Sequence, residues 1–149
     1  AKINGTVVSQ DKELIHRGNY YLVKACEGSE VSKYHLEAGI AYWHTTPTDE
    51  NKWEYILRLY NQLIIIEYSS VIALNRTFAY GKVYGKEKAI VEAEKLGLED
   101  NHYYHELLGY LYTDIDNQKA IAHYQKAVTL SKSPNERATL QKQIEQLVK

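Results

Sequence analysis

Apolar side chains recur along most of the chain at the three- and four-residue spacing of an α-helix, rather than at the alternating positions of a strand. In residues 53–64, for example, Ile56, Leu57, Tyr60 and Leu63 return to one side of a helix and form a wide apolar face. Only two prolines and eight glycines interrupt this pattern over the whole chain. The pattern therefore predicts an all-α fold.

Turn residues and capping residues divide the helical pattern into about eight segments. Pro47 lies in a turn, and Gly97 stands where a helix would end in a left-handed residue. The expected helices are 13–26, 33–44, one that starts at 49 or 51 and passes 64, 70–84, 86–96, 102–112, 118–130 and 134–149. The expected N-caps are Ser32, Asp49 or Asn51, Ser69 or Ser70, Asn101, and Asp116 or Asn117. Pro134 suits the first turn of the last helix.

The last third of the chain has the spacing of a tetratricopeptide repeat. Ala120, Tyr124 and Ala127 follow the small–aromatic–small pattern of the second helix of such a repeat. The preceding helix supplies apolar residues at the matching positions, namely Tyr104, Leu107, Leu108 and Leu111. A weaker copy begins 31 residues earlier at Ala89, close to the 34-residue period. We expect one domain over residues 1–149, a tetratricopeptide-like α-solenoid of antiparallel hairpins with the last helix as its cap.

Composition and charge exclude several classes of protein. The 149 residues carry 18 basic and 19 acidic side chains and a net charge of −1, without the basic excess of a domain that binds nucleic acid through phosphates. The longest uniform apolar run, Leu63 to Ile66, is far too short to cross a bilayer, and no signal peptide opens the chain. Methionine is absent. We expect a cytoplasmic helical interaction domain that is a fragment of a longer protein.

Tyrosine is unusually frequent, with 14 tyrosines against one phenylalanine. These rings either line a groove that stacks a peptide or bases, or fill the gaps between repeats with their hydroxyls at the solvent edge. The second interpretation is favoured by four tyrosines on predicted apolar faces: Tyr34, Tyr60, Tyr104 and Tyr124. Those expected nearer the surface are Tyr20, Tyr21, Tyr103 and Tyr112.

Candidate metal-binding and catalytic side chains form no convincing motif. His102 and His105 lie three apart on one predicted helix, a spacing that two metal ligands can use, but no carboxylate motif joins them. His44 suits a helix C-terminus, where it would contact free carbonyls. Cys26, the only cysteine, is expected to be a core residue rather than a reactive thiol. We expect no catalytic residue, no metal and no cofactor.

Asn75 and Arg76 are the least ordinary polar pair, because they follow apolar residues inside a predicted helix. Asparagine is a poor helix former, so tertiary hydrogen bonds are expected to hold it there. A buried Arg76 would need an acidic partner, for which Glu37 and Glu67 are candidates. The pair is either such a structural network or an anchor for a binding partner.

With these residues the chain resembles the C-terminal extension of a group of extracytoplasmic-function sigma factors, the bacterial proteins that direct RNA polymerase to promoters. The similarity covers nearly the whole chain and includes Ala73-Leu74-Asn75-Arg76. The other matching segments, in order, are Gln10-Asp11, Glu13-Leu14-Ile15, Tyr34-His35-Leu36-Glu37-Ala38-Gly39-Ile40-Ala41, His44, Leu59-Tyr60, Leu63, Tyr104-His105, Leu107-Leu108, Ala120, Tyr124, Ala127, Leu130, Asn135-Glu136-Arg137 and Leu140. Unlike that family, this chain has only Lys12 between Gln10-Asp11 and Glu13.

The resemblance implies a tetratricopeptide-like domain that modulates transcription initiation. Its partners would be the sigma core of the same polypeptide, RNA polymerase, or both. Promoter DNA would be contacted only through sigma regions that this chain lacks, and no membrane would be involved. Exposed tyrosines and the surface around Arg76 are candidate contacts. Two alternatives remain: a free-standing adaptor that binds a peptide, and a small-molecule sensor with a pocket lined by tyrosines and Trp43 or Trp53.

Overall fold

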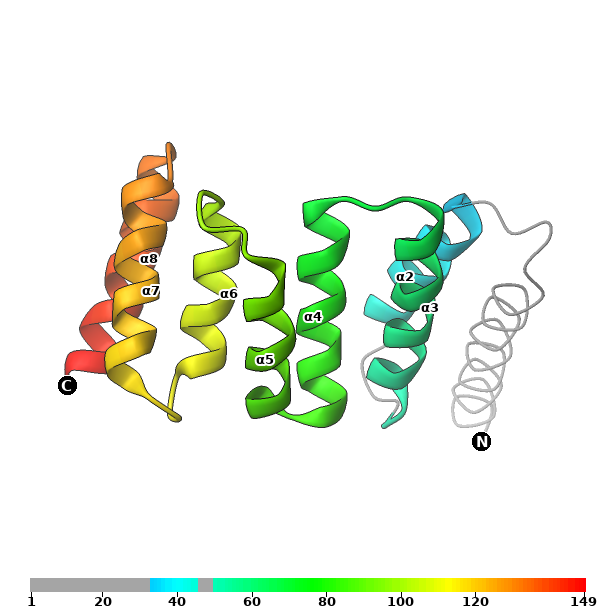
Figure 1. Cartoon of the computed structure of the whole chain (residues 1–149), viewed down its shortest axis with the longest axis horizontal. Coiled ribbons are helices and arrows are strands. Elements are labelled where there is room, and N and C mark those ends of the chain that lie inside the picture. The colour runs from blue at the N-terminus through cyan, green and yellow to red at the C-terminus, as the bar shows by residue number, and fades with distance from the viewer. Residues whose placement is uncertain (1–32, 46–49) are drawn as a thin grey trace, which may run out of the picture. The chain divides into compact units, whose positions relative to one another are not determined.

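The computed structural model describes residues 33–45 and 50–149, which form seven α-helices and no strand (Figure 1). The predicted all-α class is confirmed for this part of the chain. The expected helix 13–26, the residues Tyr20, Tyr21, Cys26 and Ser32, and the turn at Pro47 lie outside the described residues. The helices are α2 (Lys33–His44), α3 (Lys52–Ile66), α4 (Ser70–Tyr84), α5 (Lys86–Leu96), α6 (His102–Tyr112), α7 (Asn117–Leu130) and α8 (Pro134–Val148).

The helix ends follow local capping chemistry. Ser69 Oγ accepts a hydrogen bond from the Ile72 N–H, and the Asp116 carboxylate accepts one from Lys119. Gly97, after α5, has the expected left-handed backbone with φ of 60°. Because these contacts span only a few residues, the sequence predicts most boundaries within one residue.

The chain divides into two compact units, residues 1–72 and 73–149. In the described part of the first unit, α2 packs against α3. Trp43 is fully buried and stacks on Tyr55, with ring centroids 4.6 Å apart. Trp43 therefore belongs to the core of this unit. The other buried apolar residues of α2 and α3 are Leu36, Ile40, Ile56, Leu57, Leu59, Tyr60 and Leu63.

In the second unit, consecutive helices alternate in direction, and α6 packs against both α5 and α7 (Figure 1). Small residues lie where helices approach closely. A Cβ added at Gly81 of α4 would be 3.0 Å from the Ala89 Cβ of α5. The core of α4, α5 and α6 contains Leu74, Ala89, Ile90, Ala93, Tyr104, Leu108 and Leu111, and a second core between α7 and α8 contains Tyr124, Ala127, Leu140 and Ile144.

The tightest helix contact is between α6 and α7. A Cβ at Gly109 would be only 2.7 Å from two ring carbons of Tyr124, so the ring lies directly on the glycine backbone. Tyr124 was expected to fill a gap between repeats, but this contact lies within one hairpin, and its partner is a glycine that the sequence pattern did not single out.

Replacing Gly109 with alanine tests this contact. Alanine in a helix interior is ordinarily favoured over glycine by about 1 kcal/mol. The clash with Tyr124 should outweigh that gain, so we expect Gly109→Ala to lower the free energy of unfolding by about 1–3 kcal/mol in urea denaturation.

The matched control is the same substitution in a Tyr124→Ala background. With the ring removed, the added methyl has room, and Gly109→Ala should become neutral or stabilising by up to about 1 kcal/mol. Equal destabilisation in both backgrounds would contradict the assigned contact.

Candidate functional site: the α5–α6 loop and its histidine cluster

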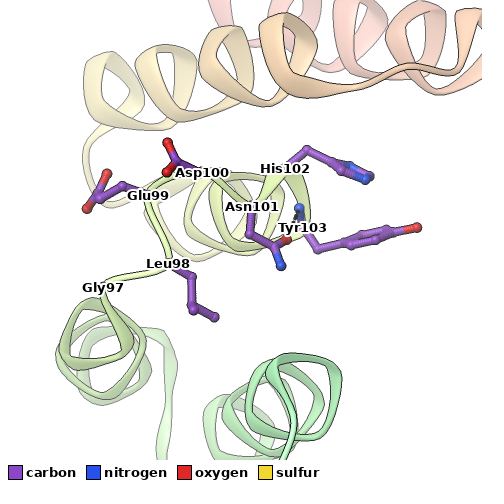
Figure 2. A pocket seen from close by; sticks show the side chains of 7 residues that line it. All are labelled: Gly97, Leu98, Glu99, Asp100, Asn101, His102 and Tyr103. Atoms are coloured by element: carbon purple, nitrogen blue, oxygen red, sulfur yellow. Dashed lines mark hydrogen bonds between the residues drawn. The ribbon is translucent and has the colours of Figure 1, made fainter.

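The loop between α5 and α6 borders an open hollow of about 510 Å³, lined by residues 97–103 (Figure 2). In Figure 2 the carboxylates of Glu99 and Asp100 point away from the rings of His102 and Tyr103. Asn101 accepts hydrogen bonds from the N–H groups of Tyr103 and Tyr104, at 2.9 and 3.3 Å. The predicted cap is confirmed, and it occupies N–H donors that an anion at this helix start would use.

Next to this loop, His105 of α6 contacts His123 of α7. His105 is 3% exposed, and the two Nδ1 atoms are 3.1 Å apart. The other ring nitrogen of His105, Nε2, lies 2.7 Å from the Glu99 carbonyl oxygen. One buried side chain thus joins α6 to both the loop and α7.

These partners determine where the protons of the neutral pair lie. A carbonyl oxygen can only accept a hydrogen bond, so Nε2 of His105 carries a proton. Nδ1 of neutral His105 is then an acceptor, and Nδ1–H of His123 donates to it. Neutral His123 therefore has a free acceptor at Nε2.

The cluster continues from His123 towards α5. The rings of Tyr112 and His123 stack almost in parallel, with centroids 5.7 Å apart. The Tyr112 hydroxyl donates to the Glu94 carboxylate. Burial and this carboxylate raise the pKa of Tyr112 to about 12. The hydroxyl therefore remains a donor throughout the physiological pH range.

His102 and His105 do not converge. His102 lies against the ring of Tyr103, and its Nδ1 is 3.8 Å from a Glu136 carboxylate oxygen, too far for a hydrogen bond. Among the described residues, no three or more His, Cys, Asp or Glu side chains are arranged so that they could hold a metal ion. The i, i+3 spacing thus places the two histidines in different environments.

Glu106 and Glu136 form an acidic pair between α6 and α8. Burial raises the pKa of Glu106, the charge of Glu136 raises it further, and His102 opposes both. Ser131 Oγ donates to the Glu136 carboxylate at 2.9 Å. The arrangement stabilises Glu136 by hydrogen bonding and disfavours the charged form of Glu106.

The remaining predicted site residues have mixed outcomes. Tyr60, Tyr104 and Tyr124 are buried, as expected for tyrosines on apolar faces. Tyr34 is 70% exposed, so its assignment to an apolar face was wrong. The exposed position of Tyr103 is confirmed.

Asn75 lies on an exposed position of α4, and the tertiary hydrogen bonds expected to hold it in the helix stay a prediction. Arg76 is half-buried, with its guanidinium 5.8 Å from the centre of the Tyr80 ring. One of its two proposed acidic partners, Glu67, pairs with Lys33 at 3.2 Å. The Arg76 guanidinium thus lies near an aromatic neighbour on its own helix.

His44 ends α2, as predicted, but Thr45 caps the free carbonyls. The Thr45 hydroxyl donates to the Tyr42 carbonyl oxygen at 2.8 Å. His44 instead meets the ring of Trp53 edge-on at 5.6 Å. Burial and the charge of Lys52 lower its pKa.

Comparison with known proteins gives a single informative similarity. No family model matches the sequence, and no solved structure matches it significantly. The chain is 31% identical over 157 aligned positions to an uncharacterized protein of Rhizobium meliloti (strain 1021). The match covers 97% of this chain but only 37% of that protein. The chain thus spans little more than a third of the relative's length.

Neutralising Glu106 tests the acidic pair. Because the pKa of Glu106 is raised on folding, its contribution to stability is present below the unfolded value of 4.5 and is lost as pH rises. We expect Glu106→Gln to raise Tm at pH 7 and to change it little near pH 4. The exposed Glu87, changed to Gln, is the control, and an equal gain there would contradict the assignment.

Proposed function

We propose that the chain is a regulatory, protein-binding domain of an extracytoplasmic-function sigma factor. It would modulate transcription initiation through contacts with the sigma core or RNA polymerase, in the cytoplasm. The observation that carries the proposal is the ordered similarity of residues along nearly the whole chain, including Ala73-Leu74-Asn75-Arg76. Tetratricopeptide-like stacking of the helices over residues 1–149 is part of the same proposal.

The described helices support a binding role rather than catalysis. In α3, Ile65 is 79% exposed, and Ile66, Tyr68 and Val71 close by are also largely exposed. Neighbouring exposed apolar side chains of this kind are common where one protein contacts another. We call these four residues the apolar surface and propose it as the contact with the sigma core or polymerase.

The Rhizobium meliloti relative is compatible with the proposal. Most of its length lies outside the match, so the matched segment is joined to other regions in that protein. A domain that regulates an attached core would have this organisation. Within the described residues, no helix combines the length and apolar character needed to span a bilayer.

Transcription in vitro tests the role directly. A full-length parent that carries sigma regions is compared with one truncated just before Ala1, on a promoter that the parent recognises. We expect truncation to change the amount of initiated transcript while the remaining core still binds polymerase. The direction of the change in transcript distinguishes an activating domain from an inhibitory one. Unchanged initiation would contradict the proposal and favour the peptide-binding adaptor.

The apolar surface is tested in the same assay with the double variant Ile65→Ser, Val71→Ser. Both positions are exposed, so the fold should lose less than about 1 kcal/mol of stability. We expect the double variant to reproduce the effect of truncation. Val148→Ser, at an equally exposed position on α8, is the matched control. If the control acts as strongly as the double variant, the contact is not at this surface.

A further inference from the structure

His105 and His123, which we call the histidine pair, connect α6 with the α5–α6 loop and with α7 in the second unit. His105 is the only described side chain that hydrogen-bonds both to the α5–α6 loop and to α7. Because α7 and α8 share their own buried core, these two helices would move together if the pair separated. Protonation of the pair can therefore affect how the whole α7–α8 hairpin is attached to α6.

The pair can accept one proton without losing a hydrogen bond. In the neutral form, Nε2 of His123 is a free acceptor, so the first proton can bind there. His123 then still donates from Nδ1 to His105. The resulting cation lies against the face of Tyr112, with which ring stacking is favourable.

A second proton cannot be added to the pair without loss of a hydrogen bond. The remaining acceptor is Nδ1 of His105, which already accepts from His123 across 3.1 Å. Protonating it would set two N–H donors and two positive rings against each other, so this hydrogen bond must break. With this hydrogen bond intact the folded pair has room for one added proton, whereas two separate histidines have room for two.

Burial and the surrounding charges act on the protonation of His123. Burial lowers the pKa of His123, His105 and Lys119 lower it further, and Glu99 and Glu94 raise it. A base whose pKa is lowered on folding contributes stability above its unfolded value of 6.5, and this stability is lost as pH falls. The titratable and charged groups that face the pair are Glu94 on α5, Glu99 on the loop, Tyr104 and Tyr112 on α6, and Lys119 on α7.

We propose that His105 and His123 form a pH-sensitive latch that holds the α7–α8 hairpin on α6 at neutral pH and releases it when the pair takes up its second proton. The inference is independent of the sigma-factor assignment. It requires only that acidification in the range below pH 6.5 opens the second unit at this junction.

Native-state hydrogen exchange of the whole chain tests the latch without any substitution. A released α7–α8 hairpin has lost the packing of α7 on α6, and its helices of 14 and 15 residues are marginal without that packing, so the amides of α7 would exchange on opening. After correction for intrinsic rates, the opening equilibrium of α7 should rise by about tenfold per pH unit for each extra proton bound. The amides of α3, in the other unit, are the internal reference, measured in a His44→Gln background because His44 packs on Trp53 and its own pKa is lowered. Equal pH dependence in α3 and α7 would overturn the proposal.

The matched variant is His123→Asn. An asparagine amide can present either N–H or oxygen near the position of Nδ1, so it can pair with neutral or protonated His105. We expect the pH dependence of α7 opening to be lost in this variant and retained in His35→Asn, an exposed histidine of α2. If His123→Asn keeps the full pH dependence, the pair is not the latch.

Discussion

The contact between the Tyr124 ring and the Gly109 backbone sets the geometry of the second unit. The ring lies where any side chain at position 109 would be, so α6 and α7 can approach in only one register at this point. His105 is four residues before Gly109, and His123 is next to Tyr124. The same hairpin brings the two histidines together, and their Nδ1 atoms are 3.1 Å apart.

The local features of the fold were predictable from the sequence. Helix ends depend on contacts over three or four residues, such as Asn101 with the start of α6, and the left-handed Gly97. Small residues at Ala89, Ala120 and Ala127 likewise indicated close helix packing, and all three are fully buried. The wrong prediction for Tyr34 came from a side chain at the edge of a helix face. Tyr34 lies two positions before the buried Leu36, and a rotation of about 100° per residue decides whether it faces the core or solvent.

The histidine pair was not predictable from the pattern of either helix. His105 and His123 are 18 residues apart, and His123 follows no motif. The signal that could have found them is their similar distance from the turn that joins α6 and α7, which places them side by side in an antiparallel hairpin. Burial by itself also does not specify the proton positions. The Glu99 carbonyl oxygen does specify them. It accepts a hydrogen bond from Nε2–H of His105, and this leaves Nδ1 of the neutral ring as an acceptor.

An interaction domain built in this way would combine an exposed apolar surface on its first unit with a protonation-dependent junction in its second. The account depends most directly on the proton positions in the histidine pair. A long-range ¹H–¹⁵N correlation spectrum of the histidine rings at pH 8 reports them. We predict protonated Nε2 in His105 and protonated Nδ1 in His123, with His123 gaining its next proton at Nε2 as pH falls. Protonated Nδ1 with unprotonated Nε2 in His105 would contradict the hydrogen bond to Glu99, and with it the latch.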